Sequence, residues 1–199
     1  MSPRRPEPPT DRPVEETADT ESAVRTILLR RLSSAPRTRS ELEKDLARRG
    51  ADPAASQAVL DRFEEVGLID DAEFAQMWVE SRHRARGLAR SVLRQELRER
   101  GVEDQLIGQA LDQIDAEREE ARAREFAGRK ARLRAGENPA KAINRLAGQL
   151  ARKGYPPSVC FQVAKDSVAA LLEQRKQDVI DEMDAGLIVD DFTEHQESV

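Results

Sequence analysis

The sequence has almost none of the features that mark a secreted, metal-binding or membrane protein. Its single cysteine, Cys160, rules out an intrachain disulfide and fits a reducing compartment. The two histidines, His83 and His195, stand far apart, so no metal-ligand spacing is visible. No apolar run approaches the roughly 20 residues that cross a bilayer, and the N-terminus has no apolar signal core. We therefore expect a cytoplasmic protein that holds no metal.

Motifs for nucleotide binding and catalysis are missing as well. The closest pair of glycines is six residues apart, which excludes G-x-G-x-x-G, and no glycine begins a G-x-x-x-x-G-K loop. No nucleophile stands beside a plausible base in the sequence. The expectation is a binding protein with no catalytic residue and no cofactor.

Aromatic residues are also scarce, and the residues that are abundant favour helices. Only seven aromatics occur, with 38% hydrophobic and 36% charged residues, which suits thin cores between helices. Ala, Leu, Arg and Glu dominate, and these lose little side-chain freedom in a helix. No proline falls between Pro53 and Pro139, and no segment alternates apolar and polar residues as a strand would. The composition predicts an all-α protein.

Charge is segregated along the chain. The net charge of −5 combines −3 over residues 1–22, +6 over 23–176 and −8 over 177–199. The proline-rich head is predicted to be disordered, because it has little to bury. The acidic tail is predicted to be a solvated end or, alternatively, a segment that docks a partner or screens the basic body.

A motif of the form Leu-x3-Leu-x3-Gly occurs three times, at offsets of 51 and 53 residues. Its copies are Leu42–Leu46–Gly50, Leu93–Leu97–Gly101 and Leu146–Leu150–Gly154. Leucines four apart share one helical face, and a glycine at that place suits the left-handed conformation that ends a helix. The motif predicts three helices that each end at a glycine.

Amphipathic segments precede and follow each of these helices, so each copy predicts a three-helix module of about 50 residues. We predict modules over residues 23–69, 70–115 and 116–176. Neighbouring modules stack, because stacking buries faces that one module leaves open. The predicted fold is three tandem three-helix repeats in an elongated, curved body with disordered tails.

Two segments give local signals. Gly67 suits a helix end, and Asp70 can cap the next helix, with Glu73 completing a capping box. Tyr155, directly after the third motif glycine, is expected to pack as the hydrophobic contact that follows such a turn. Cys160 is expected to be a small buried residue.

Phe74, Met77 and Trp78 follow the capping signal at helical spacing. Tryptophan is enriched in binding hot spots, so an exposed contact site is one interpretation. Apolar residues at this spacing are more often part of a core. We therefore predict that the three residues are buried.

Ten basic residues are the candidates for contact with an anionic partner. They are Arg82, Arg84, Arg86, Arg90, Arg94, Arg98, Arg100, Arg145, Arg152 and Lys153. Three of them, Arg90, Arg94 and Arg98, recur every four residues and predict a stripe on one helix face. Like charges at this spacing cost helix stability, which favours a surface that meets phosphates or an acidic protein. The alternative is a solvated face.

The sequence resembles the RecX family of bacterial regulatory proteins in the segments RSELEKDLARRG, VLDRFEEVGLIDDAEFAQMWVESR and RSVLRQELRERGV. The likeness covers about residues 23–174, is most specific over 67–82, and continues in a third copy that ends in ARKGYPPSVCFQVAKD. The resemblance implies a crescent of repeats that lodges in the groove of RecA filaments on single-stranded DNA. It implies inhibition of RecA's ATP hydrolysis, strand exchange and co-protease function, with effects on recombinational repair and the SOS response. We expect a monomer with no membrane partner.

The residues alone leave two other hypotheses open. One is a helix-turn-helix regulator whose basic middle helix reads duplex DNA, since three-helix modules fit that layout. The other is a helical scaffold between proteins, which would affect neither recombinase nor DNA.

Overall fold

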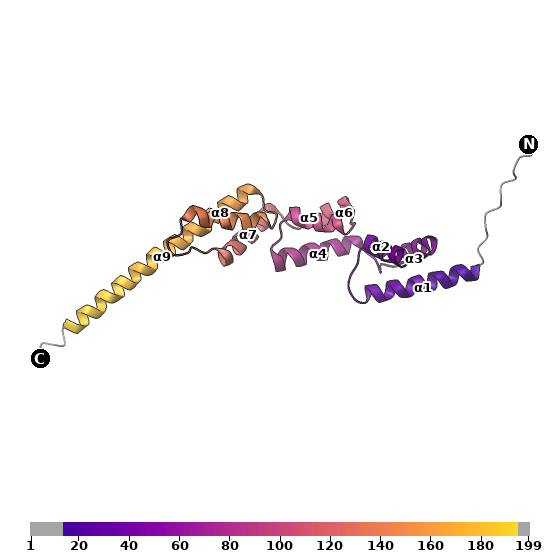
Figure 1. Cartoon of the computed structure of the whole chain (residues 1–199), viewed down its shortest axis with the longest axis horizontal. Coiled ribbons are helices and arrows are strands. Elements are labelled where there is room, and N and C mark those ends of the chain that lie inside the picture. Colours follow the sequence, from indigo (N-terminus) through magenta and orange to yellow (C-terminus); the bar gives the residue numbers. More distant parts are fainter. Residues whose placement is uncertain (1–13, 195–199) are drawn as a thin grey trace, which may run out of the picture. The chain divides into compact units, whose positions relative to one another are not determined.

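The computed structural model describes residues 14–194, and within them it contains nine helices and no strand (Figure 1). The helices are α1 (Val14–Leu32), α2 (Arg39–Arg48), α3 (Pro53–Glu65), α4 (Asp71–Arg86), α5 (Arg90–Glu99), α6 (Asp104–Leu111), α7 (Ala116–Lys130), α8 (Pro139–Ala151) and α9 (Pro157–Glu194). We call α1–α3 module 1, α4–α6 module 2 and α7–α9 module 3. The predicted all-α class with three three-helix repeats is confirmed.

Polar side chains cap several helix starts. Thr38 forms a full capping box with Glu41 at the start of α2. Asp52 and Asn138 cap α3 and α8, and in both helices a proline occupies the first turn, where its missing N–H costs nothing. The predicted cap at Asp70 is confirmed, since its Oδ1 accepts the Glu73 N–H at 2.8 Å.

The three motif glycines end their helices as predicted. Gly50, Gly101 and Gly154 have φ of 70°, 80° and 88°, a region that side chains with a Cβ disfavour. Tyr155 follows the third turn and is buried, and its N–H donates to the Leu150 carbonyl at 3.4 Å. This is the expected hydrophobic contact of a Schellman-type turn.

The chain divides into two compact units, and α4 and α5 each contribute residues to both. The first unit takes in the described residues up to Glu80 together with Arg94–Asp112. Here α1 packs on α3 and α2. The core of module 1 consists of Val24, Leu28, Leu42, Leu46, Ala55, Val59, Leu60, Phe63 and Ile69. Its small, thin apolar cluster is what the low aromatic content predicts.

The second unit takes in Ser81–Leu93 and the described residues from Gln113 onwards. In it α9 packs on α8 and α7. Its core is rich in alanine, which lets the helices approach closely, and contains Ala89, Ala123, Ala127, Leu146, Ala147, Leu150, Tyr155, Cys160, Val163 and Ala164. The burial of Cys160 is confirmed.

Three expectations need correction. The head was predicted to be disordered to residue 22, but α1 already begins at Val14, since no proline interrupts residues 14–35. The tail from residue 177 is helical to Glu194, because α9 meets no proline and gains hydrogen bonds one turn apart, such as that from Gln177 to Asp181 at 2.8 Å. Residues 1–13 and 195–199 lie outside the described residues, and the predicted module boundaries and curvature remain predictions.

The third correction concerns the predicted apolar cluster of α4. Phe74 is buried and Trp78 half-buried, but Met77 is 45% exposed. The two rings stack with their centroids 5.6 Å apart. Met77 takes no part in this ring stacking.

Candidate partner-binding surface

α5 turns one face inward and the other outward. Leu93 and Leu97 are fully buried, whereas Arg94 and Arg98 are exposed. The spacing of four residues places each pair on one helix face. Two members of the predicted arginine stripe, Arg94 and Arg98, are therefore accessible to a partner.

Arg90, the first member of the stripe, is held by the chain itself. Its backbone N–H donates to Glu119 Oε1 at 2.8 Å, and its Nη1 donates to the Ile114 carbonyl at 2.8 Å. Both acceptors lie in the second unit, at or just before α7. Arg90 thus fixes the start of α5, and a substitution here would disturb packing as well as charge.

Arg100, after the end of α5, is held in the first unit. Its guanidinium forms an ion pair with Glu41 and lies 3.8 Å from the centroid of the Trp78 ring. The Trp78 Nε1 in turn donates to Glu96 at 2.8 Å. A cation on an aromatic face that is also ion-paired contributes to stability, so we assign Arg100 a structural role.

Arg94 and Arg98 differ from these two. Arg98 Nε donates to Asp104 Oδ1 at 2.7 Å, and this bond, with the nearby charge of Arg94, holds the pKa of Asp104 below its usual range. Both partners of the pair are more than half exposed, and such pairs are worth little in water. Within residues 14–194 the Arg94 side chain forms no hydrogen bond or ion pair. A partner could therefore engage both side chains at small cost.

The arginines at the end of α4 are partly engaged. Arg84 and Arg86 are exposed and Arg82 is half-buried. Each of the three also interacts with other residues of the chain. They add positive charge to the second unit.

Lys153 lies at the centre of positive charge in the second unit. Its Nζ donates to the Arg86 carbonyl at 2.5 Å and lies 4.7 Å from the centroid of the Phe126 ring. Burial lowers the Lys153 pKa, and the charges of Arg86 and Lys130 lower it further. Arg152, the preceding residue, is exposed. Lys153 is held in place, and Arg152 is the accessible member of this pair.

Arg145 has a structural role in α8. It forms an ion pair with Glu137, and its Nη2 donates to the Arg132 carbonyl at 2.6 Å. The hydrogen bond from Arg145 keeps the Glu137 pKa below its usual range. Arg145 thereby ties α8 to the loop that precedes it.

The sequence did not reveal how consecutive modules are joined. In the first unit the Gly101 turn packs on the start of α2, where a Cβ added at Gly101 would overlap the Ser40 side chain. Thr38, which is fully buried, donates from Oγ1 to the Arg100 carbonyl at 2.7 Å. We call this contact the first glycine joint.

The second glycine joint lies in the second unit and repeats the first. The Gly154 turn packs on the start of α5, where a Cβ would overlap Ser91 and Val92. Ser91 Oγ donates to the Gly154 carbonyl at 2.6 Å, and the Ala89 N–H donates to the Lys153 carbonyl at 2.9 Å. The only sequence signal is the dipeptide Arg-Ser, repeated 51 residues apart at the starts of α2 and α5.

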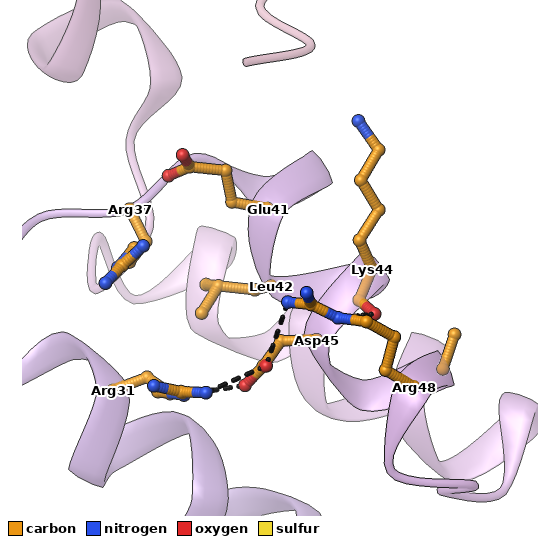
Figure 2. Close-up of a pocket in the computed structure, with 8 residues that line it drawn as sticks. Arg31, Arg37, Glu41, Leu42, Lys44, Asp45 and Arg48 are labelled. Atoms are coloured by element: carbon orange, nitrogen blue, oxygen red, sulfur yellow. Dashed lines mark hydrogen bonds and ion pairs between the residues drawn. The ribbon is translucent and has the colours of Figure 1, made fainter. Parts of the chain in front are cut away.

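A basic cavity in module 1 was also not predicted. It lies between the end of α1 and α2, and Figure 2 shows the side chains that line it. None of its cations is among the ten candidates from the sequence, because the four lie on two helices and a loop and only Lys44 and Arg48 share a helical spacing. The cavity joins the loop residue Arg37 to side chains of two helices.

The described residues offer neither a candidate metal site nor a candidate membrane span. No group of three or more His, Cys, Asp or Glu side chains between residues 14 and 194 is placed to hold a metal ion. None of the helices in that range is both long enough and apolar enough to cross a membrane.

Comparison with known families gives three consecutive matches. Residues 25–63 match the first three-helix domain of RecX, residues 70–111 match the second, and residues 117–164 match the third. Together the three matches cover more than half of the chain.

Curated relatives are similar in sequence to this chain over most of its length. A regulatory protein RecX from Streptomyces coelicolor is 48% identical over 162 residues, covering 81% of this chain and 82% of that protein. One from Thermobifida fusca is 42% identical, covering 76% of this chain and 82% of that protein. Among solved structures, RecX from Lactobacillus salivarius has a TM-score of 0.68 at 19% identity, covering 75% of this chain and 97% of that one, which supports the fold.

Proposed function

This chain belongs to the RecX family of regulatory proteins, and on that premise we propose that it regulates RecA by binding RecA filaments on single-stranded DNA. The observation that carries the proposal is the run of three RecX domains in order along one chain. The expected effect is inhibition of RecA's ATP hydrolysis, strand exchange and co-protease activity. The protein would thereby limit recombinational repair and the SOS response.

Binding rather than catalysis accounts for the effect in this proposal. A filament is a long periodic target, and three similar modules can contact several of its protomers at once. Contacts made by linked modules reinforce one another through effective concentration, so none of them needs to be strong. We expect one copy of the chain, as a monomer in the cytoplasm, to engage several RecA protomers.

The exposed pair Arg94 and Arg98 is the proposed contact on module 2. Neither side chain is needed for packing, since Leu93 and Leu97 on the inner face hold α5. Their charge would meet acidic groups of RecA or DNA phosphates. Arg82, Arg84, Arg86 and Arg152 are proposed as separate contacts of the second unit. Arg90, Arg100, Arg145 and Lys153 would have a supporting role within their own units.

The test is a titration of this protein into RecA that hydrolyses ATP on single-stranded DNA. We expect inhibition at substoichiometric amounts, because one bound chain would affect several protomers. An unchanged rate with an excess of folded protein would overturn the proposal. Selection on random duplexes would then test the helix-turn-helix alternative, which requires an operator preference and a steep salt dependence.

The double substitution Arg94→Glu with Arg98→Glu tests the proposed contact. Charge reversal should raise the concentration for half-inhibition by roughly tenfold or more, as for charges that steer and hold a complex. The matched control is Arg118→Glu with Arg124→Glu, which reverses two exposed arginines on α7 that also form surface ion pairs. Equal inhibition by the α5 variant and the control, both folded by circular dichroism, would remove Arg94 and Arg98 from the interface.

A further inference from the structure

Module 1 carries a cavity of about 600 Å³ whose lining is rich in cations. Eight residues line it: Arg31, Arg37, Glu41, Leu42, Lys44, Asp45, Ala47 and Arg48 (Figure 2). Half of them are Arg or Lys, and all lie within the first unit. The cavity belongs to no function described above.

The carboxylate of Asp45 is shared by three guanidinium groups. Arg31 Nε and Nη2 contact its two oxygens at 2.6 and 2.8 Å, and Arg48 and Arg49 each contact it at 3.2 Å. The hydrogen bond from Arg31 is the main reason that the Asp45 pKa falls to about 2. One negative charge cannot neutralise three positive ones, so this cluster keeps a positive excess.

The second carboxylate of the cavity, Glu41, is already committed to other groups. It forms an ion pair with Arg100 and accepts the Thr38 N–H in the capping box of α2. Its charge therefore balances Arg100 and does not offset the cations of the cavity.

Arg37 and Lys44 add two more positive charges. The buried Nε of Arg37 has no hydrogen-bond partner among the described residues, which is unusual for a buried donor. Lys44 forms no side-chain hydrogen bond or ion pair within residues 14–194. In Figure 2 the Arg37 side chain stands apart from the dashed contacts around Asp45. The Arg37 Nε–H is therefore a donor that a bound ligand could use.

The backbone beside Arg37 is fixed. Thr38 is fully buried, caps α2 and donates to the Arg100 carbonyl at 2.7 Å. The ring of Pro36, the residue before Arg37, fixes its own backbone φ. The Arg37 guanidinium is therefore presented from a rigid loop, so little conformational entropy is lost when an anion binds.

We propose that this cavity binds phosphate groups of single-stranded nucleic acid. Guanidinium groups form paired hydrogen bonds with phosphate oxygens, which suits the unsatisfied Arg37. The excess charge of several cations along the end of α1 and along α2 suits a polyanion better than a single carboxylate. No aromatic residue is among the eight that line the cavity. The strand would thus be held by its backbone, without stacking of bases and without sequence preference.

The inference deepens the proposed function and rests on it for the choice of single-stranded DNA. Its test uses the full chain without RecA, with fluorescence anisotropy of a labelled oligo(dT) at several salt concentrations. Arg37→Gln and Lys44→Gln should each weaken binding by roughly three- to tenfold and reduce the slope of log K against log salt by about one. Arg37→Lys should recover part of the loss, since it restores charge without paired hydrogen bonding.

Arg25→Gln is the matched control, because it removes the same charge from an exposed position of α1 outside the cavity. It should leave binding within roughly twofold of the wild type. If the folded Arg37→Gln variant binds oligo(dT) as the control does, the proposal is wrong.

Two competitors separate the sources of the anion. Inorganic phosphate should displace oligo(dT) only at concentrations where chloride of equal ionic strength also does, because one phosphate lacks the repeated charge. If a low concentration of inorganic phosphate displaces oligo(dT), the cavity binds free phosphate, and the proposal that it binds a nucleic-acid strand is wrong. Displacement by an oligoglutamate of equal charge, at the same concentration as unlabelled oligo(dT), would assign it to an acidic protein segment. Failure of the wild type to inhibit RecA would overturn the proposed function and leave this binding result standing.

Discussion

The turn at Gly50 and the turn at Gly101 have the same local structure but different surroundings. Both glycines have positive φ, and in both turns the following N–H returns to a motif leucine: Ala51 to Leu46 at 3.2 Å and Val102 to Leu97 at 3.1 Å. A Cβ at Gly101 would overlap the Ser40 side chain, whereas a Cβ at Gly50 would meet no atom of the described residues within 4 Å. One motif thus ends a helix in every module, but only in modules 2 and 3 does its turn also pack on the start of a helix of another module.

The residue before the glycine shows the same contrast. Arg49 contacts the carboxylate of Asp45, on its own helix. Arg100, before Gly101, lies on the Trp78 ring and pairs with Glu41 of module 1. The cation before the glycine therefore pairs within its own module in module 1 and becomes part of the joint in module 2.

The start of the middle helix differs in module 3. α2 and α5 begin three residues before the first motif leucine, but α8 begins at Pro139, seven residues before Leu146. The added turn, capped by Asn138, replaces the Arg-Ser start on which a glycine turn packs in the other two modules. Module 3 therefore lacks the surface that would receive a fourth module in the same way.

The largest expected difference between the turns comes from Gly→Ala substitutions. Gly50→Ala should cost about 1 kcal/mol in the free energy of unfolding, the price of a left-handed alanine. Gly101→Ala and Gly154→Ala should each cost about 1–3 kcal/mol more, because the new Cβ also overlaps a packed side chain. Urea unfolding of the three variants measures the difference. Equal losses at Gly50 and Gly101 would contradict the contrast.

The cations before the glycines should differ by a smaller amount. Arg100→Ala should lower the free energy of unfolding by about 2 kcal/mol, since it removes the contact with Trp78 and the ion pair with Glu41. Arg49→Ala should cost less than about 0.5 kcal/mol, because Arg49 is partly exposed and Asp45 keeps its ion pairs with Arg31 and Arg48. Thermal unfolding followed by circular dichroism compares them, and a larger loss for Arg49→Ala would reverse the assignment.

The smallest expected effect on stability concerns Tyr155, which follows the third motif glycine. Its hydroxyl donates a hydrogen bond to the Gly87 carbonyl at 3.1 Å. Burial raises the Tyr155 pKa to about 12. A raised pKa stabilises the fold below the unfolded value near 10, and this contribution is lost as pH rises from there through 12. Because Tyr155 is the only tyrosine, tyrosinate absorbance reports it alone.

The tyrosinate titration has two possible outcomes, which differ in the midpoint measured for the folded chain. A midpoint well above 10 in the folded chain, returning to about 10 in urea, is the predicted result. Tyr155→Phe should abolish the signal and cost about 1 kcal/mol, the usual value of one hydrogen bond. A folded-state midpoint near 10 would place the hydroxyl in water rather than on the Gly87 carbonyl.

Local structure followed from the sequence more fully than the joints did. The helix ends at Gly50, Gly101 and Gly154 and the cap at Asp70 depend on residues within one turn, which a single sequence displays. The packing of Ser40 on Gly101 joins residues 61 positions apart and leaves only a repeated dipeptide as its trace. Long-range contacts of this kind need the fold to be known.

The same limit applies to the ten basic candidate residues, whose long-range contacts a single sequence does not display. Arg90 and Arg94 occupy equivalent positions in the helical period, yet Arg90 is held by a carbonyl 24 residues away and Arg94 is exposed. The helical period predicted the helix face on which each arginine lies, but it did not predict which residues surround each side chain. The sequence did not predict the cavity at Arg37, because its lining comes from a loop and two helices.

The most direct test of the joint is a double-mutant cycle between Gly101 and Ser40. We predict that Ser40→Gly removes the extra cost of Gly101→Ala, so that the free energy of unfolding lost on Gly101→Ala falls to that of Gly50→Ala, a coupling of about 1–3 kcal/mol. A cost of Gly101→Ala that is the same with Ser40 and with glycine at that position would contradict the account, because the two residues would then not be in contact.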